Sequence, residues 1–245
     1  MRNSYKGIEI NCAKNTHEKI FKLIPDNKKL SIADIPCGYG AFVKRLQDGG
    51  YEKILAIDIQ NILQYDFDNF YIGSMTDRLP QKKQSLDVVV NIDGIEHIDE
   101  QFKFVKDVSR VLKKGGLFLI STPNISSIRS RWRWFMSGHH NKCKAPLDEK
   151  NPNPLHHIGM ISFPEIRYLL HVNGFEIKKI TTNRIKPISY LYSIFIPLIF
   201  LYTFFSYKKS GKKENTKEIN SEIFKQVFSP AVLFGESLII KAEKQ

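Results

Sequence analysis

Residues 30–42 read LSIADIPCGYGAF and join a short apolar run to a glycine-rich turn. The run 30–35 predicts a buried β-strand with Asp34 near its end. Gly38 and Gly40 predict a tight turn in which the backbone passes close to a ligand, and the helix that follows offers free N–H groups at its start. The stretch therefore predicts a strand–turn–helix unit of an α/β fold with a ligand site at the turn.

The turn does not fit a dinucleotide. A nicotinamide or flavin dinucleotide site needs the pattern G-x-G-x-x-G, and Val43 occupies the third glycine position. The carboxylate of Asp34 would also repel a diphosphate. The same carboxylate suits a ligand that carries positive charge and no phosphate, and S-adenosylmethionine, with its sulfonium and ammonium groups, is such a ligand.

A second acid, Asp58, ends the next apolar run (residues 53–57) and follows Gly40 by 18 residues. An acid at the tip of the second strand is placed to bind both hydroxyl groups of a ribose. The alternative is that Asp34 and Asp58 only cap the starts of helices, as Asp often does. The ordered set of acid, paired glycines and acid favours the ligand site.

The chain around this turn alternates short apolar runs with amphipathic stretches, which predicts β-α-β units and a mostly parallel sheet. The predicted strands cover residues 30–35, 53–57, 70–72, 86–91, 116–121, 175–180 and 236–242. The predicted helices cover residues 16–23, 41–47, 102–113 and 164–172, with Ser162 as the N-cap of the last and the glycine pair 115–116 ending the third.

Residues 34–40, DIPCGYG, resemble the D-x-G/P-C-G-x-G motif of class I S-adenosylmethionine-dependent methyltransferases. Later blocks fit the same family in order: AIDI (56–59), DRLPQKKQSLDVVVNIDGIEHI (77–98), VLKKGGLFLISTPN (111–124) and HIGMISFPEIRYLLHVNGFEI (157–177). The resemblance covers residues 25–185 and resumes at 236–242. It implies a Rossmann-like, doubly wound α/β fold with a seven-stranded, mostly parallel sheet whose last strand is antiparallel.

The resemblance also assigns cofactor positions. It places Asp34, Gly38 and Gly40 along the methionine moiety and Asp58 at the ribose, with Pro36 and Ile59 beside them in the site. The family often has an acid next to the adenine, and here Ser74 takes that position with Met75 adjacent, so that Asp77 is an alternative. Asn91, at the end of the fourth strand of this unit, is expected to face the cofactor.

Two groups of residues are candidates for chemistry on the methyl acceptor. The first, Asp93, Glu96 and His97, follows the fourth strand and resembles the E-x-x-E-H cluster of ubiquinone-pathway O-methyltransferases, with Asp93 in place of the first Glu. These side chains could hold Mg²⁺ or a similar ion, or the Glu-His pair could only open the next helix. The second, His156 and His157, follows a proline-rich loop and offers an imidazole base near neutral pH or a structural histidine. His97 is a candidate base as well.

The net charge of +12 is concentrated in the second half, since residues 1–120 hold 18 basic and 16 acidic side chains and residues 121–245 hold 19 and 9. Residues 129–144 carry five basic side chains and no acid, which could contact phosphate or lipid headgroups or form a solvated helix face. Arg129, Arg131 and Arg133 are not expected to share one helical face. Cys12, Cys37 and Cys143 are odd in number, which indicates a reducing compartment, and no signal peptide is expected.

Residues 187–207, PISYLYSIFIPLIFLYTFFSY, are uncharged throughout. They divide the chain into a lead-in helix (1–28), a methyltransferase domain (29–186), an apolar and basic insertion outside the core (187–234) and a final strand (235–245). Pro197 and the short return segment 223–234 favour an interfacial hairpin over a crossing, with tyrosines at the headgroups and lysines 208, 209, 212 and 213 attracted to anionic lipid. The competing interpretation is a buried helix or a dimer contact.

The sequence therefore predicts an S-adenosylmethionine-dependent methyltransferase acting on oxygen in a lipid-linked or amphiphilic acceptor, such as a quinone precursor or a glycan intermediate. We expect a cytoplasmic enzyme attached peripherally to the inner face of a membrane. The alternatives are a soluble small-metabolite methyltransferase, with the insertion as lid or dimer contact, and an RNA methyltransferase. The charge favours RNA, but no RNA-binding module and no N-P-P-Y-like motif is present, so nucleic acid is not the expected partner.

Overall fold

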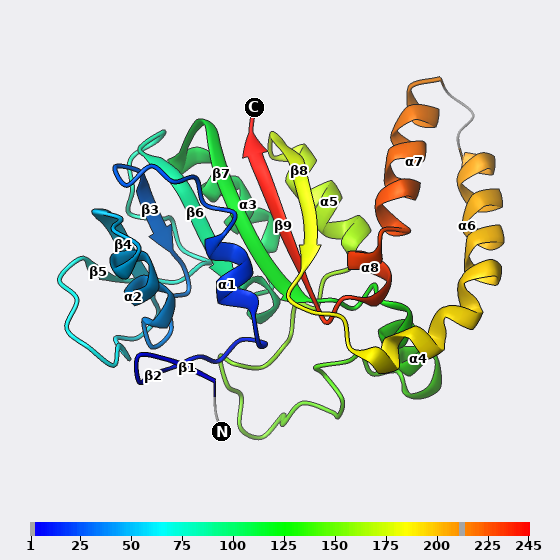
Figure 1. The fold of residues 1–245 in the computed structure, drawn as a ribbon, viewed down its shortest axis with the longest axis horizontal. Coiled ribbons are helices and arrows are strands. Elements are labelled where there is room, and N and C mark those ends of the chain that lie inside the picture. Colours follow the sequence, from blue (N-terminus) through cyan, green and yellow to red (C-terminus); the bar gives the residue numbers. More distant parts are fainter. Residues whose placement is uncertain (1–2, 211–213) are drawn as a thin grey trace.

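The computed structural model describes residues 3–210 and 214–245 (Figure 1). Seven strands form the main sheet in the order β5-β4-β3-β6-β7-β9-β8. Their bounds are β3 Ser31–Asp34, β4 Lys53–Asp58, β5 Phe70–Ile72, β6 Leu86–Ile92, β7 Leu112–Pro123, β8 Phe175–Thr182 and β9 Ser237–Lys244. Strand β9 pairs antiparallel with both β7 and β8, and the other neighbouring strands pair in parallel. The predicted fold class is confirmed.

Helices cover both faces of this sheet, with α1 and α2 on the near side in Figure 1 and α3 and α5 on the far side. Their bounds are α1 Thr16–Phe21, α2 Ala41–Asp48, α3 Gln101–Val111 and α5 Phe163–Val172. The period of two in β6 separates the two cores, because Val88 and Val90 pack against α2 while Val89 packs against α3 and α5. The strongly apolar strands are thus buried on both faces, as parallel sheets require.

The helix α3 ends earlier than the glycine pair predicted. It stops at Val111, and Leu112 already pairs with Leu86 as the first residue of β7. Gly115, with a φ of +73°, lies inside the irregular start of that strand. The strand register, not the glycine pair, therefore ends the helix. Helix α5 begins as predicted, with the Ser162 N–H donating to the Glu165 carboxylate at 2.8 Å.

The N-terminal segment contains more than the predicted lead-in helix. A small hairpin, β1 Ser4–Tyr5 and β2 Ile8–Glu9, precedes α1 and packs against α2 through Ile8, Ile10 and Ala41. It is held there by the hydroxyl of Tyr5, which donates to Asp48 at 3.0 Å. The hairpin brings residues 9–13 to the carboxyl edge of the sheet, where the candidate site lies.

The insertion between β8 and β9 is helical and projects from one end of the sheet (Figure 1). It consists of the 3-10 helix η2 Pro187–Phe195, then α6 Ile196–Ser210, α7 Glu214–Val227 and α8 Pro230–Phe234. Pro197 lies at the junction of η2 and α6. Lys212 and Lys213, predicted to attract lipid, lie outside the described residues.

The prediction that the whole insertion lies outside the core is wrong at its C-terminal end. Val227 and Val232 are buried in the main core, and Ile223 packs against it. The guanidinium of Arg167 on α5 also donates to Glu222 at 3.0 Å and to Gln226 at 2.8 Å. The second half of α7 and all of α8 are therefore part of the folded domain, because their apolar side chains cover α5 and β8.

Candidate functional site

A cleft of about 840 Å³ opens at the carboxyl ends of β3, β4 and β6. Parallel strands bring the residues that follow them to one edge of the sheet, which is where open α/β sheets bind ligands. The cleft is lined by the turn after β3, by residues 58, 59 and 62, by residues 73–76 and by the segment 92–99. Most of the predicted cofactor and acceptor residues thus border one continuous space.

Asp34 lies at the inner end of this cleft and is 1% exposed. Neither of its carboxylate oxygens accepts a hydrogen bond from any described residue. Burial, and next the charge of Asp58, raise the pKa of Asp34 well above its usual value. A buried carboxylate without a donor is costly, and a cationic ligand with N–H groups would relieve that cost.

Asp58 shapes the turn as well as lining the cleft. Its carboxylate accepts the N–H of Gly38 and the N–H of Ile59, each at 2.8 Å. Gly38 adopts a φ of +52°, and no heavy atom lies within 4 Å of the point where a side chain would begin. The backbone at Gly38 is therefore open toward the cleft, together with Pro36 and Ile59, which also line it.

Gly40 does not line the cleft, contrary to the prediction. A side chain at this position would meet Leu63 and Tyr65 at 2.8 Å, so Gly40 is needed to let the segment after β4 pack on the turn. Its φ of +87° also requires glycine at the start of α2. Its role is to shape the turn from behind.

Asn91 also departs from the prediction, because its side chain is fully buried and does not line the cleft. Its amide nitrogen donates to the carbonyl of Ile35 at 2.7 Å and contacts the sulfur of Met75 at 3.2 Å, while its oxygen accepts from Ile95 at 3.1 Å. Asn91 therefore links β6 to the glycine turn and to the start of the next segment, where it holds the walls of the site together.

Ser74 and Met75, the residues that the resemblance places at the adenine, line the cleft beside Thr76. The Ser74 hydroxyl oxygen accepts the N–H of Thr76 at 3.1 Å and lies 2.8 Å from the Thr76 hydroxyl. Asp77, the alternative acid, is exposed and lies outside the cleft lining. This part of the cleft therefore offers two hydroxyl groups.

In the lining of the same cleft the structure brings together Glu96, His97 and His157, whose nearest ligand atoms all lie within 4.8 Å of one another. Asp93 is not in this cluster, because its carboxylate accepts the hydroxyl of Ser121 at 2.6 Å. The cluster forms around the short 3-10 helix η1 Ile95–His97, where the imidazole rings of His97 and His157 meet edge to face at 4.8 Å. His156 contributes its carbonyl oxygen, 3.1 Å from Nδ1 of His97, and its ring does not line the cleft.

This cluster does not fit Mg²⁺. Magnesium prefers oxygen ligands in octahedral geometry, whereas two of the three side chains here offer imidazole nitrogens. Burial and the charge of Asp93 also raise the pKa of Glu96 well above its usual value, which favours the neutral acid over a carboxylate ligand. Burial lowers the pKa of both His97 and His157, so both rings are neutral at neutral pH. The group is suited to moving a proton.

The sequence did not predict one part of the lining of the cleft. Residues 9–13 and His17 come from the N-terminal hairpin and α1, and Lys142 comes from the loop after α4 Ile128–Ser137. Burial lowers the pKa of His17 to about 3, so this ring is a neutral packing group against Phe42. These segments carry no recognisable motif, and only their tertiary position reveals them.

The profile of a methyltransferase-domain family matches residues 11–180, more than half of the chain. The chain belongs to this family. The chain is 32% identical to a "Probable S-adenosylmethionine-dependent methyltransferase" of Mycolicibacterium smegmatis. The match covers 53% of this chain and 49% of that protein. A ubiquinone/menaquinone biosynthesis C-methyltransferase of Campylobacter jejuni is 32% identical over 38% of this chain and 44% of its own length. The chain thus spans about half or less of these relatives.

A solved structure confirms the fold of this methyltransferase domain. An S-adenosylmethionine-dependent methyltransferase from Archaeoglobus fulgidus superposes with a TM-score of 0.57 over 93% of this chain and 92% of that one, at 18% identity. The predicted resemblance to class I methyltransferases is therefore confirmed by both sequence family and fold. At that identity the likeness concerns the fold alone.

Proposed function

We propose that this methyltransferase-domain protein transfers a methyl group from S-adenosylmethionine to an oxygen atom of an amphiphilic acceptor. The observation that carries the proposal is one cleft lined both by Asp34, a buried carboxylate without a hydrogen-bond partner among the described residues, and by the neutral imidazole pair His97 and His157. The carboxylate suits a cationic cofactor, and the imidazole pair suits removal of a proton from an acceptor.

The cofactor end is built for positive charge without phosphate. Asp58 is close enough to Asp34 for its charge to raise the pKa of Asp34. A ligand with an ammonium or sulfonium group would therefore be attracted by both carboxylates. Asp58 keeps carboxylate lone pairs for ribose hydroxyls beyond its two backbone contacts. When bound, the sulfonium would present its methyl carbon to an aligned nucleophile, with the neutral thioether as the leaving group.

The acceptor end supplies a base of defined orientation. The carbonyl of His156 can only accept, so the proton of neutral His97 resides on Nδ1 and leaves the lone pair on Nε2. In the proposed step the bond between carbon and sulfur breaks, the bond between acceptor oxygen and carbon forms, and the hydroxyl proton moves to Nε2 of His97. His157, whose Nδ1 has no partner among the described residues, is placed to orient the hydroxyl.

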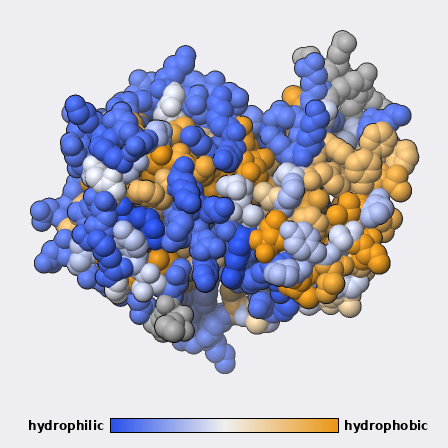
Figure 2. All heavy atoms as spheres, in the orientation of Figure 1, coloured by the Kyte–Doolittle hydropathy of each residue, from blue (hydrophilic) through white to orange (hydrophobic). Residues whose placement is uncertain are grey.

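An amphiphilic acceptor is supported by the surface of the insertion. Residues Pro187–Lys209 form the single candidate membrane-length helix found among the described residues, and only 6% of its most apolar window is buried. Figure 2 shows the corresponding side of the molecule as a broad hydrophobic area. Leu191, Ile194 and Leu198 are each at least 70% exposed. Such a surface in contact with water marks an interaction site.

We assign this surface to the face of a membrane, on the cytoplasmic side. Thr182 of β8 pairs with Leu238 of β9, so the chain leaves and re-enters the sheet at one place. A single crossing cannot return it there, and α7 is too charged to serve as the second crossing. The helix is therefore proposed to lie in the interface, with Lys208 and Lys209 near anionic headgroups.

The relatives support acceptors of this class. Besides the C-methyltransferase named above, a ubiquinone biosynthesis O-methyltransferase of Rickettsia bellii is 32% identical over 44% of this chain and 48% of its own length. A quinone precursor and a lipid-linked glycan both place a hydroxyl near an apolar tail. An imidazole base suits an acceptor hydroxyl, which must lose its proton. The same base would also suit a carbon acceptor with an acidic C–H bond.

Transfer of a tritiated methyl group from labelled cofactor to a cell extract tests the proposal. The extract is separated afterwards into lipid, glycan, soluble-metabolite and RNA fractions. We expect the label in the lipid fraction, bound to oxygen as a methyl ether or a methyl ester. Label in the soluble metabolites would instead establish the small-molecule enzyme, and label in RNA would overturn the proposal.

A further inference from the structure

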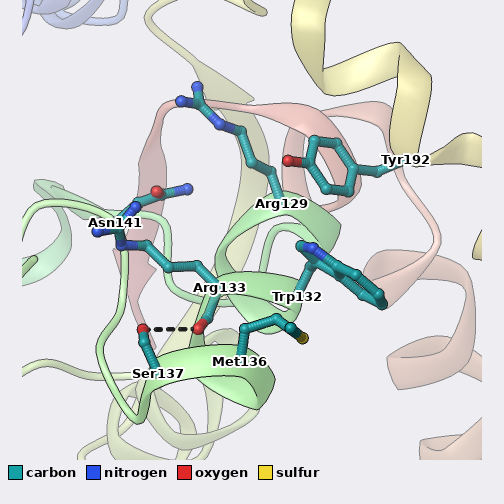
Figure 3. Close-up of a pocket in the computed structure, with 7 residues that line it drawn as sticks. All are labelled: Arg129, Trp132, Arg133, Met136, Ser137, Asn141 and Tyr192. Atoms are coloured by element: carbon teal, nitrogen blue, oxygen red, sulfur yellow. Dashed lines mark hydrogen bonds between the residues drawn. The ribbon is translucent and has the colours of Figure 1, made fainter.

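Two smaller hollows lie between the cleft and the apolar insertion and share lining residues with one another. The first, of about 310 Å³, is lined by Arg129, Trp132, Arg133, Met136 and Tyr192, together with two polar residues (Figure 3). The second, of about 150 Å³, is lined by several basic side chains and one acid. These are Arg129, Lys142, Lys144, Lys186 and Glu236.

The three spaces share walls. Arg129 and Asn141 line both hollows, and Lys142 lines both the second hollow and the cleft. Lys142 also acts on the acceptor end directly, because its charge lowers the pKa of Glu96 against the effect of burial. The apolar insertion, the basic hollow and the cleft that holds His97 are therefore neighbours in this order.

The basic hollow holds more positive charge than the protein neutralises. Glu236 is paired with Lys186 at 2.6 Å and lies 3.8 Å from Lys142. Burial alone would raise the pKa of Glu236, but these two cations and Arg184 outweigh it and lower the pKa to about 2. Arg129 and Lys144 have no acidic partner among residues 3–210 and 214–245. Two cations at one wall, without a counter-charge, are the groups that a phosphate recognises.

The outer hollow is apolar where it meets the insertion. Trp132 stacks on Phe195 of η2 at 4.8 Å between ring centroids, which joins α4 to the exposed apolar surface. Figure 3 shows Arg129 and Arg133 reaching out from the same side of α4 above Trp132 and Met136. Arg129 and Arg133 lie one turn apart on α4 and line the same hollow, whereas Arg131 does not line it, so the three arginines of this stretch do not share one face, as predicted.

We propose that these hollows bind an amphiphilic acceptor by its phosphate or diphosphate group. The anionic group lies in the basic hollow against Arg129 and Lys144, the apolar chain runs outward over Trp132 and η2, and the remaining part of the molecule enters the cleft past Lys142. This inference rests on the proposed function and narrows its acceptor to lipids whose headgroup is joined through phosphate. A membrane lipid recognised only at the surface would not need the connection to the cleft.

Farnesyl diphosphate is a suitable probe, because it combines a diphosphate with a short apolar chain. Both tryptophans of the chain, Trp132 and Trp134, belong to α4, so tryptophan fluorescence reports binding at the outer hollow. Farnesol and inorganic diphosphate serve as the two halves of the probe. The test variant is Arg129→Gln/Lys144→Gln, and the matched control Lys82→Gln/Lys83→Gln removes the same charge from exposed positions before β6.

We expect farnesyl diphosphate to bind at least about tenfold more tightly than farnesol or inorganic diphosphate, and the test variant to lose that advantage while the control keeps it. Equal affinity of wild type and test variant for farnesyl diphosphate would overturn the proposal. Inorganic diphosphate binding as tightly as the probe would replace it with a free-phosphate site, and displacement of the probe by an RNA oligonucleotide would replace it with a nucleic-acid site. Calorimetry with S-adenosylmethionine on the same variants tests the proposed function separately, because neither pair of substitutions touches the cofactor end.

Discussion

The substitution Asp34→Asn removes one charge from the cofactor end of the cleft and conserves the size of the side chain. The carboxylate of Asp34 has no hydrogen-bond donor among the described residues, so we attribute its role to the ligand. Loss of a charge-assisted hydrogen bond to the cationic amino-acid part costs about 1.5–3 kcal/mol, which weakens S-adenosylmethionine binding roughly 10- to 150-fold. Adenosine carries no such charge, and its affinity should change by less than about threefold by the same reasoning.

The same substitution should stabilise the ligand-free protein at neutral pH. Burial raises the pKa of Asp34 in the folded state above the value of 3.8 expected for an unfolded chain. The folded state therefore holds the proton more tightly, and the free energy of unfolding falls as the pH rises above about 4 toward the folded-state pKa. Asparagine does not ionise and suffers no such loss, so Asp34→Asn should have the higher Tm.

Calorimetry with both ligands and thermal unfolding without ligand measure these effects, and Asp77→Asn, at an exposed acid outside the cleft, is the control. The control should change neither affinity nor Tm. A parallel loss of adenosine affinity in Asp34→Asn, or a lower Tm, would refute the reasoning, because it would make Asp34 a structural residue instead of a charge held for the ligand.

Glutamate at Leu191, Ile194 and Leu198 should abolish flotation with anionic liposomes, which the unmodified protein is expected to show, because these side chains are exposed and apolar. His157→Ala should lower kcat more than it weakens cofactor binding, since His157 lines the acceptor end of the cleft. The pH profile of kcat should stay flat down to about pH 6.5 and fall only below it, because burial lowers the pKa of His97 from 6.5 and the base is lost when the ring is protonated. Exhaustive chelation and later addition of Mg²⁺ should leave kcat unchanged, since the clustered donors do not suit that ion.

Each of these expectations has a matched control or a contradicting result. For flotation the control places three glutamates at Phe102, Tyr168 and Val172, which are exposed on α3 and α5, and loss of flotation in this control would point to charge alone. Equal loss of turnover and cofactor affinity in His157→Ala would indicate a folding defect. A rate that falls already above pH 7, or that returns only with Mg²⁺, would contradict the proposed neutral base.

The strand–turn–helix unit and the positions of the main strands could be predicted because their signals are local. The apolar run before Asp34, the two glycines and the spacing to Asp58 each describe a few neighbouring residues, and the structure places Asp34 and Asp58 in one cleft. The pair His97 and His157 was predicted as two separate groups, and only the fold shows that they meet at 4.8 Å.

Residues whose role depends on distant partners could not be predicted. The position of Asn91 predicted a contact with the cofactor, but its side-chain amide contacts Ile35, Met75 and Ile95 inside the protein instead. Lys142 belongs to a basic stretch without periodicity, and its place between two spaces follows from the path of the loop after α4. A sequence pattern carries no record of such long-range contacts.

The central claim is that the cleft holds a cationic nucleoside cofactor without phosphate. A calorimetric titration of the unmodified protein with S-adenosylmethionine and, separately, with NAD tests it directly. We predict saturable binding of S-adenosylmethionine at one site per chain and no measurable heat with NAD, because Asp34 and Asp58 repel a diphosphate. Binding of NAD that is as tight as that of S-adenosylmethionine, or no binding of S-adenosylmethionine, would contradict the account.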